Sequence, residues 1–459
     1  MLVLFLTRKP KNSVHLSYRA WGCVPQLLRL ACVRPSGRRQ TDLRFLEAPV
    51  KNRFSCVLVL GTALGLFPTP GAAQKYVQKN LVSDLALPNN ADGSKVLQDP
   101  AFLNPWGITR SANSPWWINL NNFGWSSIYT GAGEPASFIN EADGTVGNFV
   151  VVPTSPSFPA GTISNPTGIV FNGSGTDFLM PKGTPANQQA IFIFVGEDGT
   201  ISGWNPFVNV PAGKNPPSPN PALQVDNSQG GAITGAVYKG ATSALLNGKH
   251  YLYVTNFRSG HVEVYDTNFN RVRLSEDAFN PNGGGEGEDF NHGGEHVPQG
   301  FAPFNIQNIG GNLFVTYAKQ NAQKHDDVAG DGNGYVVIYT PAGKRVAHLE
   351  HGSWMNSPWG VVWTPRDFGH FSNSLLVGNF GSGWIAAFNG FTYKFEGFLR
   401  SSTDNSLLFI DGLWSLTFGN DGAAGPATTL FFTAGLNGEA DGLFGTLVPA
   451  PGESDGSIE

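Results

Sequence analysis

The chain has 459 residues, with 58 Gly, 32 Pro and 12% aromatic residues, but only 14% charged residues and a formal net charge of −5 at pH 7. This composition disfavours long helices and favours short strands joined by turns. A hydrophobic fraction of 41% excludes a disordered chain, because that much apolar surface can build a core.

The N-terminal region predicts export. The stretch KNRFSCVLVLGTALGLFPTPGAAQ places two basic residues before an apolar run and ends in small residues suited to cleavage. We expect a signal peptide over residues 50–73, since the run is too short for a transmembrane span. A buried strand or helix is the alternative. All three cysteines precede residue 57, so the expected mature chain has no disulfide.

The segment before this signal is unusual in its position and charge. Our hypothesis is that translation begins at Val50 and that residues 1–49 form a disordered extension. An organelle transit peptide is the rival, because the segment is rich in Arg and poor in acids. Residues 1–73 hold 11 of the 29 basic residues and only 2 of the 34 acidic ones, which leaves the remainder near −14. Such an acidic chain is a poor partner for nucleic acid or anionic membranes.

A short motif recurs along the rest of the chain. Pro-Trp-Gly occurs at residues 105–107 and 358–360, each time before apolar residues, and related stretches lie between and after them. We call the aligned position of each unit its anchor. The anchors are Gly107, Gly168, Gly240, Asn305, Gly360 and Ser415, separated by 61, 72, 65, 55 and 55 residues.

Each unit continues with two or three alternating strands bounded by Gly, Asn and Asp turns, as in HYLYVTNFRSG followed by HVEVYD. A repeat of this kind predicts an all-β fold, a six-bladed β-propeller of three- to four-stranded antiparallel blades over residues 74–450. We expect residues 76–84 to close the ring as an N-terminal strand paired with residues 442–449. Two unrelated β-sandwiches are the rival, but they would not explain the repeated anchor.

The anchor is expected to lie in the innermost strand of each blade. Proline suits the entry of such a strand, and glycine allows the crowded inner strands to approach one another. Trp106 and Trp359 are predicted to pack between neighbouring blades, with ligand stacking as the alternative.

Several stretches resemble a known family. They include NPWGI, EDGTISGWNP, NFRSGHVEVYD, APFNIQNIGG, LLVGNFGSG and IDGLWSLTFGN. The chain is similar over residues 76–450 to uncharacterised secreted bacterial proteins with six-bladed, NHL-like propellers, some of which carry a PEP-CTERM sorting signal. The resemblance implies the fold and no settled activity. Residues 451–459 lack the apolar span of a sorting tail, so we expect a disordered end and a released protein.

Topology predicts where function would lie. In a propeller, the turns between second and third strands share a face with the entries to the innermost strands, and loops carry function on such scaffolds. The ligand-binding candidates on that face are Asn121, Asn122, Asn256, Arg258, Lys319, His325, Asn379 and Glu439. The stretch EDGTISGWNP (197–206) is interpreted as a hairpin whose tryptophan packs in the core.

The long loop at residues 317–335 is the most polar of these segments. Its Asp326 and Asp327, together with Asp441, are candidate oxygen ligands for Ca²⁺. His325 is a candidate general base or metal ligand, although no nucleophile accompanies it. Local salt bridges and Asx turns are the alternative interpretation.

The sequence therefore supports two functions. The first is an extracytoplasmic binding or scaffold protein that holds a small molecule, glycan or protein over the central channel. The alternative is a Ca²⁺-dependent hydrolase or lactonase, so whether the chain is an enzyme stays open, and no cofactor other than Ca²⁺ is indicated. We expect a secreted or periplasmic monomer with no nucleic acid partner and no membrane anchor.

Overall fold

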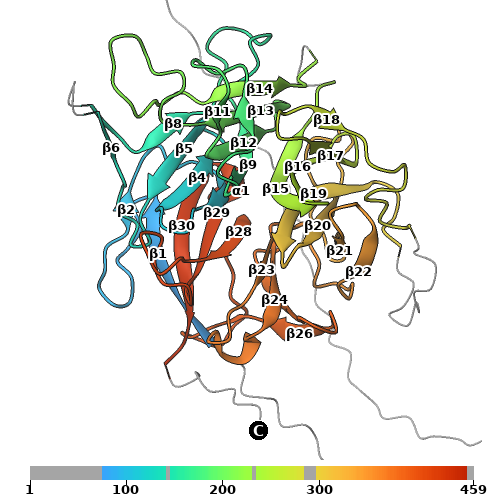
Figure 1. The fold of residues 1–459 in the computed structure, drawn as a ribbon. Helices are drawn as coiled ribbons and strands as arrows, with labels where there is room; N and C mark the ends of the chain where they lie inside the picture. The colour runs from blue at the N-terminus through green and yellow to red at the C-terminus, as the bar shows by residue number, and fades with distance from the viewer. Residues whose placement is uncertain (1–74, 141–144, 230–233, 284–295, 452–459) are drawn as a thin grey trace, which may run out of the picture. The chain divides into compact units, whose positions relative to one another are not determined.

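The computed structural model describes residues 75–140, 145–229, 234–283 and 296–451, all within one compact unit, Pro68–Glu459. The expected extension, signal peptide and C-terminal tail lie outside these residues, apart from Pro451. The described chain forms six blades of four antiparallel strands each, with two further short strands joined to the sheet of the last blade, which confirms the predicted six-bladed β-propeller. The innermost strands lie toward the centre of the ring (Figure 1).

The first three blades follow one another along the chain, each running from the innermost strand outward. Blade 1 contains β3 (Pro105–Thr109), β4 (Trp116–Leu120), β5 (Trp125–Tyr129) and β8 (Phe149–Val151). Blade 2 contains β9 (Pro166–Phe171), β12 (Phe192–Gly196), β13 (Thr200–Trp204) and β14 (Ala222–Asp226). Blade 3 contains β15 (Tyr238–Leu246), β16 (Lys249–Asn256), β17 (His261–Tyr265) and β18 (Arg271–Val272).

The last three blades complete the ring. Blade 4 contains β19 (Phe301–Ile309), β20 (Asn312–Lys319), β21 (Gly334–Tyr339) and β22 (Arg345–His348). Blade 5 contains β23 (Pro358–Trp363), β24 (Ser374–Asn379), β25 (Ile385–Asn389) and β26 (Phe395–Phe398). Blade 6 contains β28 (Leu413–Phe418), β29 (Leu430–Gly435), β30 (Asp441–Pro449) and the N-terminal β1 (Lys75–Ser83).

The pairing of β1 with β30 closes the ring as predicted, with Val77 opposite Val448 and Lys79 opposite Thr446. Joining the two ends of the described chain in one sheet protects the strand edges that an open ring would expose. Minor elements decorate the loops: β2 (Leu97–Gln98), β6 (Phe138–Asn140), β7 (Thr145–Gly147), β10 (Leu179–Met180), β11 (Gln188–Gln189), β27 (Arg400–Ser401), the 3-10 turn η1 (Gly369–Phe371) and the short α1 (Leu436–Glu439).

All six anchors lie in innermost strands, and each pairing of an innermost strand with its neighbour is irregular at or beside the anchor. A β-bulge bends the strand and increases its twist, which suits strands that converge on an axis. At the glycine anchors there is no room for a larger side chain. A Cβ atom on Gly168 would lie 2.7 Å from the amide nitrogen of Ala241 in the next blade, and one on Gly107 would lie 2.3 Å from the carbonyl oxygen of Thr167.

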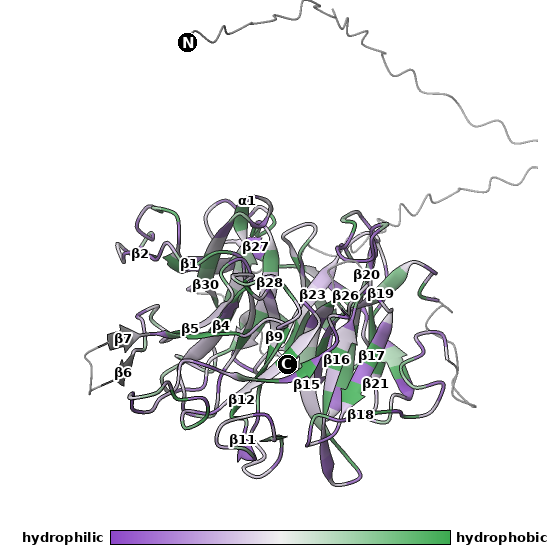
Figure 2. Ribbon diagram, turned by 90° about the horizontal axis from the view of Figure 1, so that it is seen from above, coloured by the Kyte–Doolittle hydropathy of each residue, from purple (hydrophilic) through white to green (hydrophobic). Residues whose placement is uncertain are grey.

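Apolar side chains fill the spaces between successive blades. Six buried clusters of the described residues each join two neighbouring blades, as Val170 and Ile193 of blade 2 join Leu252 of blade 3. In Figure 2, hydrophobic residues (green) recur along the strands, while much of the purple lies in the connecting loops. These clusters hold the blades rigidly around the channel, which positions the loops at its ends.

Candidate functional site

One end of the central channel gathers polar side chains from several blades. The innermost strands begin at this end, and the turns between second and third strands open onto it. We call this end the upper mouth. It is formed by Asn104, Asn121, Asn122, Glu197, Lys239, His325, Asp326, Asp327 and Glu439, whose charges or hydrogen bonds reach one another.

Aromatic rings close the channel beneath the upper mouth. The aromatic floor consists of Trp106, Phe304, Trp359 and Trp414, each immediately before the anchor of its blade, and all four are buried. The Trp106 and Trp414 rings stack with centroids 3.6 Å apart, and Trp359 meets both edge-on. As predicted, Trp106 and Trp359 pack against a neighbouring blade, since both contact Trp414 of blade 6. These contacts lie in the central channel.

Lys239 supplies a buried positive charge above this floor. It occupies the same position before the anchor of blade 3, and its side chain is 2% exposed. The ammonium nitrogen lies 4.8 Å from the ring centroid of Trp106, in a cation–π contact, and forms an ion pair with Glu197. Oδ1 of Asp326 lies 3.9 Å from the same ammonium nitrogen. Burying an ion pair costs desolvation energy that can exceed the attraction of its charges, so the pair is weak evidence for stabilisation.

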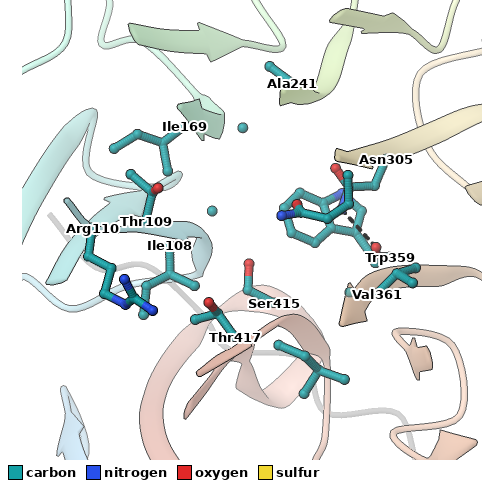
Figure 3. Close-up of a pocket in the computed structure, with 15 residues that line it drawn as sticks. Ile108, Thr109, Arg110, Ile169, Ala241, Asn305, Trp359, Val361, Ser415 and Thr417 are labelled. Carbon is teal, nitrogen blue, oxygen red and sulfur yellow. Dashed lines mark hydrogen bonds between the residues drawn. The ribbon is translucent and has the colours of Figure 1, made fainter. Parts of the chain in front are cut away.

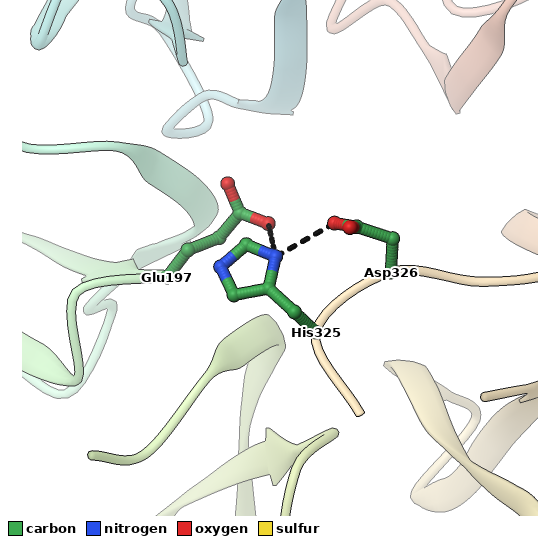
Figure 4. Close-up of side chains that lie close together, drawn as sticks. All are labelled: Glu197, His325 and Asp326. Atoms are coloured by element: carbon green, nitrogen blue, oxygen red, sulfur yellow. Dashed lines mark hydrogen bonds and ion pairs between the residues drawn. The ribbon is translucent and has the colours of Figure 1, made fainter. Parts of the chain in front are cut away.

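Three side chains that could hold a metal lie beside this ammonium. The ligand atoms of Glu197, His325 and Asp326 are within 4.8 Å of one another (Figure 4). Nδ1 of His325 lies 2.6 Å from Oδ1 of Asp326 and 4.0 Å from Oε1 of Glu197. Because Oε1 of Glu197 already pairs with the ammonium of Lys239, a divalent cation here would compete with that ammonium for the carboxylate.

Asn104 connects the aromatic floor to the rim. Its Oδ1 accepts a hydrogen bond of 3.0 Å from Nε1 of Trp414, and its Nδ2 donates one of 2.8 Å to Oε2 of Glu439. Asn122 donates to the Glu439 carbonyl at 2.6 Å, and Asn121 donates to Oε2 of Glu197 at 3.0 Å. All three amides come from blade 1, which lies between the blades that carry the two acids.

Crowding of carboxyl groups perturbs their protonation. Burial raises the pKa of Glu439, and the charges of Glu197 and Asp327 add to that rise. Burial also raises the pKa of Asp327. The pKa of Asp326 is lowered, chiefly by its hydrogen bond to His325. The mouth therefore holds more acid than its single buried lysine neutralises, and it attracts cations and hydrogen-bond donors.

A groove of about 470 Å³ extends from the mouth. Glu197, Asp198 and His325 form its polar end. Its other wall comes from the loop between β8 and β9, including Phe158 and the exposed Ile163. Burial raises the pKa of Asp198, which sits at the bottom of the β12–β13 turn. A mixed polar and apolar groove of this size suits a small organic ligand.

The structure brings together some of the predicted site residues and not others. Asn121, Asn122, His325, Asp326, Asp327 and Glu439 lie at the upper mouth. Arg258 donates to the Gly235 carbonyl and is close enough to Asp326 for their charges to interact. Lys319 lies exposed at the end of β20.

Three other candidates are occupied elsewhere. Asn256 donates to Glu263 within its own blade, and Asn379 donates to the Trp384 carbonyl. Asp441 accepts from Asn437 and is not among the clustered metal-capable groups of the described residues.

Sequence reasoning missed Glu197, Lys239 and Asn104. The hairpin over residues 197–206 is correct, with β12 and β13 paired, but its turn carries the central carboxylate of the mouth. A signal for Lys239 was present, because it stands before an anchor where three of the other blades place tryptophan. A lysine at such a position indicates a charge held inside the channel.

The side chains of the upper mouth can bind a polar ligand and can donate or accept protons. The carboxylates accept hydrogen bonds, Lys239 and the amides donate them, and His325 can carry a proton between the groove and Asp326.

The part of the chain that the structure describes contains no helix with the length and apolar character of a membrane span.

Comparisons with known proteins place the chain in a family. No family model matches it. It is 30% identical over 361 residues to "Uncharacterized protein L690" of Acanthamoeba polyphaga mimivirus, covering 76% of this chain and 81% of that protein. It is 28% identical over 424 residues to "Uncharacterized protein R648" of the same virus, covering 90% and 91%. A streptogramin B lyase structure aligns with 82% of this chain and 97% of its own, with a TM-score of 0.41 and 13% identity. The chain belongs to the same family as the mimivirus L690 protein.

Proposed function

We propose that the protein binds a small hydroxyl-rich ligand, such as a monosaccharide or short glycan, at the upper mouth. The proposal rests on the buried ammonium of Lys239, which pairs with Glu197 and lies 3.9 Å from Asp326, above the aromatic floor. Taking a charged pair out of water costs free energy, so its retention at this end of the channel supports recognition.

The chemistry around the lysine favours hydroxyl groups. The mouth offers an excess of carboxylate acceptors with amide and ammonium donors among them, and sugar hydroxyls both donate and accept. The groove wall at Phe158 and Ile163 supplies an apolar surface for the C–H face of a ring.

The test is calorimetric titration with a panel of neutral monosaccharides and disaccharides, after a thermal-shift screen. Phe158→Ala and Asp326→Asn alter the groove and the mouth at partly exposed sites. Each should weaken a hit at least about tenfold, or about 1.4 kcal/mol. Phe207→Ala removes an exposed ring that does not line the groove and is the matched control. A panel without hits, or hits unaffected by both variants, would refute the proposal.

A metal-dependent hydrolase is the second candidate, favoured by the clustered ligand atoms of Glu197, His325 and Asp326. Its test is a thermal melt with Ca²⁺, Mn²⁺ or Zn²⁺, in the wild type and in Lys239→Met. Stabilisation of the wild type would support the metal site, and lactones and esters would then be screened. Stabilisation of Lys239→Met alone would show that the ammonium takes the place of the cation.

We further propose that the protein acts outside the cytoplasm. The support is the signal-like sequence over residues 50–73, which lies outside the described residues. The intact mass of protein recovered from the culture medium tests both export and the start at Val50. A mass that includes residues before Val50 would refute that start, and absence from the exported fraction would refute export.

A further inference from the structure

The aromatic floor prevents a ligand at the upper mouth from extending down the central channel. Below the floor lies a separate cavity of about 220 Å³, lined by residues of all six innermost strands (Figure 3). Most of its lining comes from positions at or after the anchors, such as Ile108, Thr109 and Thr417, whereas the floor residues precede the anchors. A ligand longer than a single sugar ring must therefore leave the mouth outward, across its rim.

The rim on blade 5 is a turn that contains two glycines. Residues 380–383 (Phe-Gly-Ser-Gly) join β24 to β25, and Gly383 has a left-handed backbone with a φ of 69°. A Cβ atom on Gly383 would lie 2.8 Å from Cε2 of Phe409, and one on Gly381 would lie 2.9 Å from Cβ of Ala329. The two glycines therefore let side chains from the neighbouring loops lie directly on the backbone of this turn.

The neighbouring loops expose apolar side chains here. Phe409, in the loop before β28, is 59% exposed, although Leu408 and Ile410 on either side of it are buried. Val328, beside Ala329 in the long loop of blade 4, is 38% exposed. We call the surface formed by Val328, Ala329, Gly381, Gly383 and Phe409 the blade-5 rim. Isolated exposed apolar residues are common on proteins, so the significance of this surface depends on where it lies.

The blade-5 rim adjoins the upper mouth. Val328 directly follows Asp327, one of the acids of the mouth. Phe380, which begins the glycine turn, stacks on Trp414 of the aromatic floor with ring centroids 3.9 Å apart. The turn is thereby packed against the floor, and the rim forms part of the wall of the mouth.

A hydrogen bond ties the loop that carries Phe409 to the same site. Asp411, two residues after Phe409, accepts a hydrogen bond of 2.7 Å from the backbone nitrogen of Asn437, and Asn437 belongs to α1, which ends at Glu439. The aromatic ring is thus carried by a loop that is attached beside the mouth, which limits the conformational entropy that binding must overcome.

The groove described above lies on the other side of the mouth. The β12–β13 turn of blade 2 contributes Glu197 and Asp198 to its polar end, and its apolar wall includes Phe158 and Ile163. Blades 2 and 5 are three places apart in a ring of six, so the groove and the blade-5 rim lie on opposite sides of the mouth. A ligand that contacts both surfaces must span the mouth.

We propose that the upper mouth binds an oligosaccharide that spans it, with one sugar ring in the groove and another stacked on Phe409. This inference rests on the proposed function and defines its ligand as a chain rather than a single ring. An exposed aromatic ring offers a flat apolar surface to the C–H face of a sugar, and the mouth between the two apolar surfaces accepts and donates hydrogen bonds. A monosaccharide can occupy only one of the two surfaces, so affinity should rise with chain length.

The test is calorimetric titration with glucose, xylose and N-acetylglucosamine and with their linear β-1,4-linked oligomers of two to six units. In at least one series, the longest oligomers should bind the wild-type protein at least about tenfold more tightly than the monomer, or about 1.4 kcal/mol. Phe409→Ala should remove most of this gain, and Phe409→Tyr, which keeps an aromatic ring, should retain it.

Phe391→Ala is the matched control. Phe391 is 79% exposed and also belongs to blade 5, but it follows β25 and lies at the opposite end of that strand from the glycine turn. Its loss should leave the gain unchanged. Val328→Asn alters the same rim from a different loop and should also reduce the gain, which provides a second variant if Phe409→Ala fails to fold.

The possible outcomes separate the spanning mode from binding at the mouth. Sugar binding without a gain from chain length, or with a gain that persists in folded Phe409→Ala and in Val328→Asn, would overturn the spanning mode and leave binding in the groove. A lack of binding by every monomer and oligomer would overturn both.

Discussion

The hydroxyl of Ser415 donates a hydrogen bond of 2.8 Å to the carbonyl oxygen of Trp106, which joins the sixth blade to the first on the channel axis. Asn305 makes the equivalent contact between blades 4 and 5, donating to the Trp359 carbonyl at 2.8 Å. Ser415 and Asn305 are the two anchors that are not glycine. Where glycine brings two backbones into contact, these side chains span the gap with a hydrogen bond.

This relationship predicts a non-additive loss of stability. Thr433 also donates to the Trp106 carbonyl, at 2.6 Å, so Ser415→Ala should cost only about 0.5–1.5 kcal/mol of unfolding free energy. Adding Thr433→Val would leave a buried carbonyl unpaired, and the double variant should lose more than the sum of the singles. Urea denaturation measures all three. Strict additivity would show that the carbonyl finds another donor.

The ion pair at the upper mouth predicts a large effect of one substitution. Lys239→Met removes the counter-charge of Glu197, whose side chain is only 11% exposed, and should reduce the unfolding free energy by about 3–5 kcal/mol. Glu197→Gln in the same chain removes the uncompensated charge and should recover most of the loss. Chemical denaturation of both variants is the measurement. A small effect of Lys239→Met would mean that water reaches Glu197 freely.

The anchor glycines predict a steric effect. Gly168→Ala places a Cβ 2.7 Å from the backbone of the next blade, so the inner strands must separate, at a cost of about 1–3 kcal/mol. Gly147→Ala is the control, because its nearest neighbour is a ring carbon of Phe149 at 4.0 Å. Melting temperatures compare the two. Equal values would contradict close contact between the inner strands of blades 2 and 3.

Replacing Glu439 by glutamine should stabilise the protein in a pH-dependent way. Its folded-state pKa is raised above the ordinary value of 4.5, so its ionised form is costlier in the folded than in the unfolded protein. That cost is absent below pH 4.5 and grows as pH rises through the raised pKa. Glu439→Gln keeps an oxygen to accept from Asn104 and should raise the melting temperature by about 1–2 °C at neutral pH, with no gain at acid pH. The exposed Glu134→Gln is the control, and equal shifts in both variants would contradict the mechanism.

The six-bladed ring follows from local features of the sequence. Alternating strands, turn residues and a repeated anchor fix the number of blades, because each blade must bury its faces against two neighbours. The same repeat fixed the closing strand, since β30 would otherwise leave an open edge beside a stretch that alternates in the same way.

The composition of the upper mouth, in contrast, depends on contacts between blades. Glu197 and Lys239 lie 42 residues apart, and His325 comes from a third blade, so no local pattern signals that they meet. The turns at Asn256 and Asn379 resemble the turn at Asn121 in sequence, but they direct their amides into their own blades. Which side chains turn toward the channel depends on blade geometry around the axis, and that geometry is set by contacts distant in the chain.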